Sequence, residues 1–518
     1  MADAGAPGVR ETDRASPAVW AGFAMMCVGM FMAILDIQVV ATSLPTIQGA
    51  LHIRPDQMSW VQTAYLVAEV IAIPLTGYLT RVLGMRWLFV IAVSVFTFAS
   101  IGCASSNGFE TLIAWRVLQG FSGGTLIPAV FSAVFLLFPA RQEGVATTIA
   151  GVLAVLAPTV GPVAGGWITH TYSWHWLFLI NVIPGLVAAV GAAILLPRAK
   201  ISLREARTLD LIGLTLMAIA LSALEIALKE APSRGWSSPL VLGLLAACLI
   251  SAAGFVWRSL TWRHPVVELR TLGDPRFAVA CLLSFVLGMG LFGSTYLMPV
   301  FLALVREHDA LQIGQIMLVT GIAQLATAPI AVALERRIDA RLLAAFGFVL
   351  FAVGWGMSAN QTPDTDFQAM IWPQIVRGVA IMFCLLPPTR LALGHLSADK
   401  IPDASGLFNV TRNLGGAIGI ALIDTIMFGR APEHGRLITE QLKAGNVETA
   451  KLVGIPLDLF EAGRGQPIDA DTTAILQPMV EKLALTQAIN EAWMAIAVLL
   501  ALVVLALFVI ARKPRAPA

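Results

Sequence analysis

Charged residues are scarce in this chain of 518 residues. Asp, Glu, Lys and Arg together make up 13%, whereas 57% of the residues are hydrophobic and the mean hydropathy is +0.79. A soluble protein of this length needs more charge to cover its surface. Apolar runs of about 18 residues or more, each long enough to cross a bilayer as a helix, recur from Ala18 almost to the C-terminus. The composition therefore predicts a polytopic membrane protein in contact with the lipid bilayer.

Cysteine and histidine are also rare, with five and seven residues. The cysteines fall in apolar runs, without the spacing of a metal site or a disulfide framework, so packing is their expected role. The histidines lie in loops or at span ends and form no ligand cluster. We therefore expect no metal and no cofactor. A net charge of +2 without a basic tail gives no reason to expect nucleic acid as a partner.

The sequence lacks two kinds of catalytic machinery. No GxxxxGK[ST] phosphate loop occurs, which argues against ATP as the energy source. There is also no combination of nucleophile, base and orienting residue that would indicate an enzyme. We expect a protein that is not an enzyme and whose function depends on the few ionisable residues inside its spans.

The apolar runs predict fourteen membrane spans. They cover residues 18–44, 58–80, 87–105, 109–138, 145–169, 177–196, 211–229, 239–257, 277–304, 313–335, 342–359, 368–393, 404–428 and 488–511. The first span is too long for a signal-peptide core and contains an aspartate, so we expect an uncleaved first helix. An even number of spans places both termini on one side of the membrane.

Lys and Arg indicate which side this is, because they are enriched in cytoplasmic loops. With the termini inside, most basic residues fall in inner segments. The short outer loops hold only Arg54, Arg234, Arg306 and the marginal Lys229. We therefore expect both termini in the cytoplasm.

Two halves of the chain repeat a pattern. Span 4 contains WRVLQG, with Arg116 and Gln119 on one helix face, and span 12 contains WPQIVRGV, with Gln374 and Arg377 at the same separation. The loop RVLGMR after span 2 and the loop RRIDAR after span 10 lie about as far apart in the sequence as Arg116 and Arg377 do. We infer that spans 1 to 6 repeat as spans 9 to 14 in a parallel duplication, with spans 7 and 8 inserted.

This pattern divides the chain into seven segments. They are an N-terminal segment 1–17, a six-helix half 18–197, a linker 198–210, two inserted spans 211–257, a linker 258–276, a second half 277–511 and a tail 512–518. The polar stretch 429–487 is the longest outer segment. Ile475, Met479 and Leu483 follow a helical spacing there, which predicts an amphipathic helix that rests on the outer membrane surface or docks a partner protein.

Ionisable residues inside spans are costly and therefore candidates for function. Asp36 in span 1 and Glu69 in span 2 are candidate proton carriers, because burial and a nearby cation shift a carboxyl pKa in opposite directions. Arg116 is the candidate cation, and a purely structural ion pair with Asp36 is the alternative. The roles of Glu225, Asp424 and Arg412 are left open; interface packing, an outer solvated position and a structural role, respectively, explain them as well.

A substrate cavity is predicted from polar and aromatic residues of both halves. The candidates are Gln119, Gln374, Arg377, Phe292 and Tyr296. Ordinary helix packing explains these residues equally well. Span 5 contains GVLAVLAPTVGPVAGGWI, in which prolines remove backbone donors and glycines permit close helix approach, so we expect it to be kinked and tightly packed.

Five stretches occur in order on the first six spans: LDIQVVATSLPTI, GYLTRVLGMR, WRVLQG, APTVGPVAGGWI and SWHWLFLINVIPG. Together they resemble the major facilitator superfamily, and specifically its fourteen-span drug:proton antiporters of the EmrB type. The resemblance covers nearly the whole chain. It implies an all-α polytopic fold with 14 transmembrane helices arranged as 6+2+6.

The resemblance also implies a function and motif residues. The function is proton-driven export of hydrophobic or amphiphilic toxic compounds across the cell inner membrane, with a periplasmic membrane-fusion adaptor and an outer-membrane channel as further partners in Gram-negative members. The antiporter motif corresponds to Pro158, Gly161, Pro162, Gly165 and Gly166, and the cytoplasmic loop motif to Gly77, Arg81, Gly84 and Arg86. The family usually has an aspartate where Arg81 stands and other polar residues at Gln38 and Ala41. We therefore expect the charge contacts between the cytoplasmic loop and the helices to differ from the usual ones, and the proton path to be altered.

Our mechanistic hypothesis is alternating access around a site between the halves, near mid-membrane, with Asp36 protonated from outside and deprotonated inside. Two other functions remain open. One is a dedicated exporter of a single metabolite, such as a fatty acid or siderophore, which competition among unrelated compounds would distinguish. The other is a membrane sensor or scaffold that binds ligand without moving protons.

Overall fold

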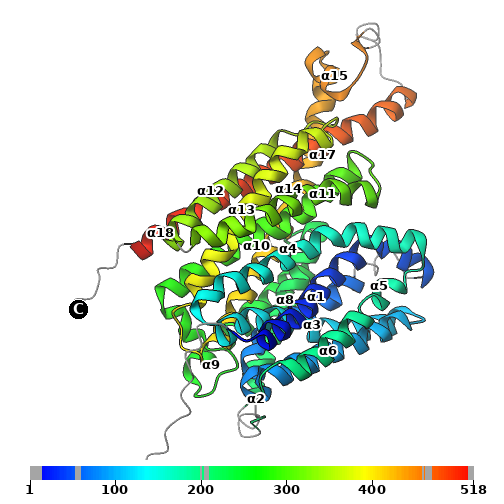
Figure 1. Ribbon diagram of the computed structural model, residues 1–518. Coiled ribbons are helices and arrows are strands. Elements are labelled where there is room, and N and C mark those ends of the chain that lie inside the picture. The colour runs from blue at the N-terminus through cyan, green and yellow to red at the C-terminus, as the bar shows by residue number, and fades with distance from the viewer. Residues whose placement is uncertain are drawn as a thin grey trace, which may run out of the picture.

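The computed structural model describes residues 15–52, 60–198, 201–202, 209–335, 337–457, 460 and 470–511, and these residues contain helices but no strand. Two helical bundles lie side by side (Figure 1), one from the blue and cyan N-terminal helices and one from the green-to-red C-terminal helices. This arrangement confirms the predicted all-α polytopic fold.

The first bundle, which we call the first half, contains α1 (Pro17–Ala50), α2 (Trp60–Ala104), α3 (Phe109–Leu137), α4 (Ala140–Thr171), α5 (Trp176–Leu179) and α6 (Val182–Leu195). The inserted helices are α8 (Leu211–Arg234) and α9 (Pro239–Thr261), followed by the short η1 (Leu269–Gly273). The second half contains α10 (Pro275–Leu304), α11 (Ala310–Glu335), α12 (Ala340–Met357), η2 (Ser358–Asn360), α13 (Phe367–Leu393), α14 (Ile401–Lys443), α15 (Val447–Val453), α17 (Ala470–Leu502) and α18 (Val504–Ala511).

Within the described residues, twelve helices are long and apolar enough to cross a membrane, or thirteen with the bent helix α4. One of them, α2, has 45 residues, which corresponds to about 68 Å of helix and is far more than one bilayer crossing needs. Its path is interrupted at Gly84, where φ is 74° and ψ is 156°, a conformation that favours glycine. The number of fourteen spans depends on counting α2 twice and stays a prediction.

Each half has its own apolar core. Phe23, Phe89 and Phe131 are at most 1% exposed in the first half, and Phe348 and Trp355 are fully buried in the second. Glycines permit close helix contacts inside these bundles. A side chain at Gly120 of α3, for example, would overlap the backbone carbonyl of Tyr65 in α2. The two cores fix the helices that carry the ionisable residues.

The halves meet mainly where α14 packs on α2 and α11 packs on α4; α14 also contacts α3, and α13 contacts α4. A side chain at Gly314 of α11 would overlap Val163 of α4, so these two helices pack closely. On the other side of the molecule, Ser405 of α14 donates a hydrogen bond to the carbonyl of Pro128 in α3, at 3.0 Å. Arg412 of α14 also lies 5.3 Å from the ring centre of Phe131 in α3.

The stretch predicted as a long outer loop is partly helical. Helix α14 does not end near residue 428 but continues to Lys443, and its exposed part carries the helical ion pair Arg436–Glu440 at 2.9 Å. Val480 and Leu483 of α17 pack against Ile438 of α14 and Val453 of α15, and this small unit projects from one end of the bundle (Figure 1). The predicted amphipathic helix is thus present, and part of its apolar face packs against the protein itself. Contact of this helix with the membrane surface or with a partner protein stays a prediction. The side chain of Ile475 lies outside the described residues.

Candidate functional site

Asp36 of α1 and Arg116 of α3 form an ion pair in the interior of the first half. The Arg116 Nη1 atom lies 2.5 Å from Asp36 Oδ2, and both side chains are completely buried. The two predicted coupling residues are therefore brought together, within one half rather than between the halves. A pair in such surroundings is held by direct charge attraction that water barely screens.

Neutral donors complete the surroundings of the Asp36 carboxylate. Its Oδ1 atom accepts hydrogen bonds from Gln119 Nε2 at 2.9 Å and from Asn181 Nδ2 at 2.8 Å. Gln119 Nε2 also donates to Ser100 Oγ at 2.9 Å. Sequence reasoning placed Gln119 in the substrate cavity and did not select Asn181 or Ser100. The motif at the start of span 6 contains Asn181 and carried the available signal, whereas nothing marked Ser100.

Arg116 is held in place by further contacts. Its Nε donates to the backbone carbonyl of Val61 at 3.0 Å, and Nη1 donates to Gln119 Oε1 at 2.7 Å. The guanidinium carbon lies 4.4 Å from the ring centre of Tyr65, a distance suited to a cation–π interaction. The Tyr65 hydroxyl in turn donates to the carbonyl of Ala33 at 3.2 Å. Helices α1, α2 and α3 are thus tied together around one cation.

Glu69 of α2 lies apart from this network. It is 4% exposed, and among the described residues its carboxylate has no hydrogen-bond partner. It interacts electrostatically with Glu225 of the inserted helix α8, and more weakly with Arg116 and Asp36. The structure therefore brings the inserted helix into contact with the predicted coupling region.

The antiporter motif bends α4 against α1. The helix axis turns by 43° between Pro158 and Val160, which confirms the predicted kink. A side chain at Gly161 would overlap Gln38 of α1, and the carbonyl of Gly165 accepts a hydrogen bond from Ser43 of α1 at 3.4 Å. Tight packing is thus confirmed as well. Pro162 is buried in the same bend, and the Gly166 carbonyl accepts a hydrogen bond from Thr169.

The predicted cavity residues of the second half fall in two places. Gln374 and Arg377 of α13 are 1% and 2% exposed and lie in the interior of that half, where Thr320 donates to Gln374 Oε1 at 3.0 Å. Tyr296 of α10 is partly exposed and donates from its hydroxyl to Asp424 of α14 at 2.6 Å. Phe292, one turn before Tyr296 in α10, packs against Gly416 of α14.

The cytoplasmic loop motif contacts both halves. Arg81 forms an ion pair with Asp403 at the start of α14, and Gly77 lies so close to Asp403 that a side chain there would overlap it. Arg86 donates to the carbonyls of Ala193 and Leu196 at the end of α6. An arginine at position 81 thus finds an acid in the other half, a partner that sequence reasoning did not identify.

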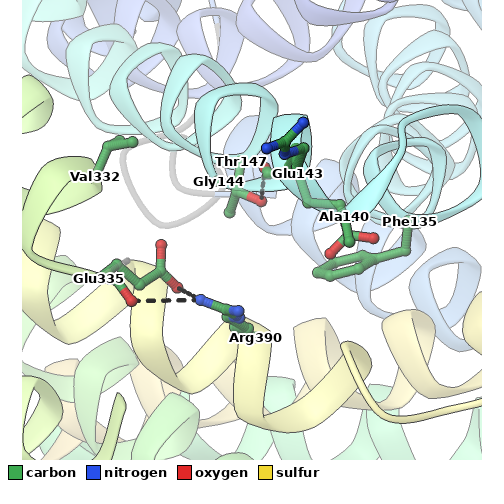
Figure 2. Close-up of a pocket in the computed structure, with 9 residues that line it drawn as sticks. Phe135, Ala140, Glu143, Gly144, Thr147, Val332, Glu335 and Arg390 are labelled. Carbon is green, nitrogen blue, oxygen red and sulfur yellow. Dashed lines mark hydrogen bonds and ion pairs between the residues drawn. The ribbon is translucent and has the colours of Figure 1, made fainter. Parts of the chain in front are cut away.

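A cavity of about 350 Å³ lies between the halves at the end of the molecule where α4 begins and α11 ends. Figure 2 shows Glu143 and Thr147 of α4 on one side of this cavity, with Glu335 of α11 and Arg390 of α13 on the other. Arg390 Nη1 lies 3.9 Å from Glu335 Oε1. The lining combines charged side chains of both signs with apolar groups such as Phe135 and Val332.

The chain was compared with known proteins. Residues 26–420 match the family model described as the Major Facilitator Superfamily. The chain is 35% identical over 485 residues to the colistin resistance protein EmrB of Acinetobacter baumannii, an alignment that covers 93% of this chain and 94% of that protein. It is 33% identical over 419 residues to the multidrug export protein EmrB of Escherichia coli K12, with 80% of this chain and 81% of that protein covered.

One solved structure of similar fold is that of the proton:xylose symporter XylE of the major facilitator superfamily. The TM-score is 0.56 at 12% identity, and the match covers 93% of this chain and 94% of XylE. At this identity the likeness concerns the fold alone. It agrees with the two helical bundles described above.

The buried pair makes a testable prediction for stability. Arg116→Met and Asp36→Leu each leave one buried charge without its partner, and we expect each to lower the free energy of unfolding by about 3–5 kcal/mol. The double variant removes both charges, so its loss should fall short of the sum by about 2 kcal/mol or more. Denaturant titration of the four proteins in one detergent measures this coupling. Additive losses would show that the two residues do not depend on each other.

The contact between Arg81 and Asp403 predicts a charge-reversal experiment. Arg81→Asp or Asp403→Arg alone places like charges between the ends of α2 and α14, and pulsed EPR distances between spin labels on these ends should lengthen. The double reversal restores opposite charges and should restore the wild-type distances. Arg436→Asp, on the exposed part of α14, is the control and should leave them unchanged. If the double reversal stayed as wide as the single variants, the pair would not hold the halves together.

Proposed function

The chain belongs to the major facilitator superfamily, and from this membership we propose that it exports hydrophobic or amphiphilic toxic compounds in exchange for protons. Relatives named for multidrug export and colistin resistance, at 33% and 35% identity, support drug efflux as the transport function. The buried Asp36–Arg116 pair is the observation that supports proton coupling. The multi-pass architecture provides the route across the membrane.

Proton coupling follows from the surroundings of Asp36. Ionised Asp36 balances the charge of Arg116 and accepts from Gln119 and Asn181, so both carboxylate oxygens have donors without a proton on the acid. Protonation removes the negative charge and leaves Arg116 without a counter-ion, which destabilises this packing of α1 against α3. The network thus has two energetically distinct states that a proton can select. One charge crossing 100 mV supplies about 2.3 kcal/mol for such a step.

Alternating access would make use of the contacts between the halves. Arg81–Asp403 and the hydrogen bond from Ser405 to Pro128 join α14 to the first half at one end of the molecule. In the proposed cycle this end is the cytoplasmic one, and the contacts break when the inner side opens. Substrate would bind between the halves, where Phe292 and Tyr296 of α10 are partly exposed. Glu69 would be a second coupling residue, through its electrostatic interactions with Glu225, Arg116 and Asp36.

The proposed orientation places the protein in the cytoplasmic membrane with both termini inside. The basic residues Arg81, Arg86, Arg141 and Arg341 then face the cytoplasm, as the distribution of Lys and Arg in membrane proteins favours. The 6+2+6 division at residues 18–197, 211–257 and 277–511 belongs to this proposal. In it, the segment 429–487 is periplasmic.

We also propose that the projecting unit of α14, α15 and α17 contacts a periplasmic membrane-fusion adaptor, which would lead to an outer-membrane channel. The unit has its own small core and extends beyond the bundle (Figure 1), so its surface is available without unfolding. Leu452 on its surface is 58% exposed. A photo-crosslinker at Leu452 should label a membrane-fusion adaptor that is co-expressed with the transporter, and absence of labelling by such an adaptor would contradict this contact.

Transport in inverted membrane vesicles tests the proposed function. With a proton gradient in place, we expect several unrelated lipophilic compounds, such as tetraphenylphosphonium and tetraphenylborate, to dissipate the gradient in a protein-dependent way. Asp36→Asn should reduce the response at least tenfold, because the variant lacks the carboxyl group that exchanges the proton. A pH-sensitive dye follows the gradient. Glu307→Gln is the matched control, since its carboxylate is exposed and far from the pair.

Three other results would change the assignment. A response to a single compound class only, such as fatty acids, would identify a dedicated exporter instead. Binding of compounds without any proton movement would indicate a sensor or scaffold. Full proton-coupled export by Asp36→Asn would remove Asp36 from the coupling step.

A further inference from the structure

Among the described residues of the second half, five buried hydrogen-bond donors have no acceptor: Arg306 Nε near the end of α10, and four donors in the interior of the half. The four interior donors are Arg377 Nη1, Gln374 Nε2, Trp355 Nε1 and Trp493 Nε1. None of these residues is more than 2% exposed. A buried donor without a partner costs about 1–3 kcal/mol, and more when it is charged, so four of them in one half require an explanation.

These donors belong to one contiguous cluster from α12, α13 and α17. The guanidinium carbon of Arg377 lies 4.6 Å from the ring centre of Trp493, and the rings of Trp493 and Trp355 are 4.5 Å apart. The backbone of Arg377 also packs directly on Gly354, the neighbour of Trp355 in α12. Gln374 lies one helical turn from Arg377 on α13. The cluster thus combines one positive charge with neutral N–H groups.

No carboxylate among the described residues pairs with Arg377. None of the ion pairs that these residues form includes it, whereas Arg116 at the matching place in the first half has Asp36. Three buried acceptors among the described residues of this half have no hydrogen-bond partner. Gln324 Oε1 and Gln361 Oε1 are neutral amide oxygens, and Asp403 Oδ1 belongs to a carboxylate that already pairs with Arg81. Neutral groups, including water, satisfy N–H donors but do not balance a buried charge. Cation–π contact with Trp493 offsets only part of the cost.

In the first half, comparable donors surround the carboxylate of Asp36. There, a carboxylate accepts from an arginine and from two side-chain amides, at 2.5 to 2.9 Å. The second half repeats the arginine and the amide, but indole N–H groups lie beside them and no acid among the described residues pairs with the arginine. An anion from solution would complete this arrangement as Asp36 completes the other.

We propose that the second half binds a small monovalent inorganic anion, such as chloride, between Arg377 and the indole N–H groups of Trp355 and Trp493. The near-complete burial of these side chains excludes an anion of drug size. The anion neutralises the guanidinium and stabilises the packing of α12, α13 and α17. This site is separate from the Asp36 network and independent of the proposed transport cycle.

Thermal unfolding of the full-length protein in nanodiscs tests this site. Chloride is titrated against gluconate at constant ionic strength, so that only the small anion changes. We expect the melting temperature of the wild type to rise with chloride along a saturating curve. Trp493→Phe keeps the ring but loses one charge-assisted N–H contact, and its half-saturating chloride concentration should be about tenfold higher. Arg377→Gln should lose the response.

Matched variants separate this site from other effects of chloride. Trp372→Phe changes a 67% exposed tryptophan on α13, and Arg412→Gln changes another buried arginine of the same half. Both should keep the wild-type midpoint. If Arg377→Gln does not fold, Trp355→Phe and Trp493→Phe carry the test. The proposal would be overturned by a wild type that responds equally to gluconate, or by an unchanged midpoint in both indole variants.

Discussion

A guanidinium group buried inside a bundle of apolar helices needs a counter-charge, and the first half of this protein is arranged to supply one. Arg116 has its acid on α1, its backbone acceptor and aromatic partner on α2, and its amide neighbour one turn along α3. These contacts orient three helices around one charge. Because a proton on Asp36 would remove that counter-charge, the same interaction that holds the bundle together makes it sensitive to protonation. Stability and proposed coupling therefore share one set of atoms.

The contacts around the pair connect it to neighbouring elements. Asn181 connects the carboxylate to the start of α6, and the bent helix α4 packs on α1 through Gly161. Helix α4 also contacts α11 of the other half at Gly314. A shift of α1 relative to α3 would thus reach the boundary between the halves through α4. The two halves share their helical scaffold but differ in the surroundings of their buried arginines, since no acid among the described residues pairs with Arg377.

The sequence was informative where a property is local to one helix. Spans, the kink of α4, the inward position of Arg116 and its shared face with Gln119 follow from apolar length, proline content and helical spacing. Asp36 and Arg116 were selected because charges inside spans need partners. The resemblance to the superfamily is likewise confirmed by the match over residues 26–420. Partners that lie far apart in the chain were harder to predict: nothing in the spacing pointed to Asp403 for Arg81. The extension of α14 was missed because polar helices stabilised by ion pairs resemble loops in a hydropathy profile.

Proton release on substrate binding tests the central claim most directly. Purified protein in weakly buffered detergent is mixed with tetraphenylphosphonium, or with another compound that responds in vesicles, and a pH dye records the protons released. If substrate and proton compete through the Asp36–Arg116 pair, the wild type releases protons on binding, while Asp36→Asn binds the compound and releases none. Equal release by the two proteins would contradict this account and would place the exchanged proton on another group.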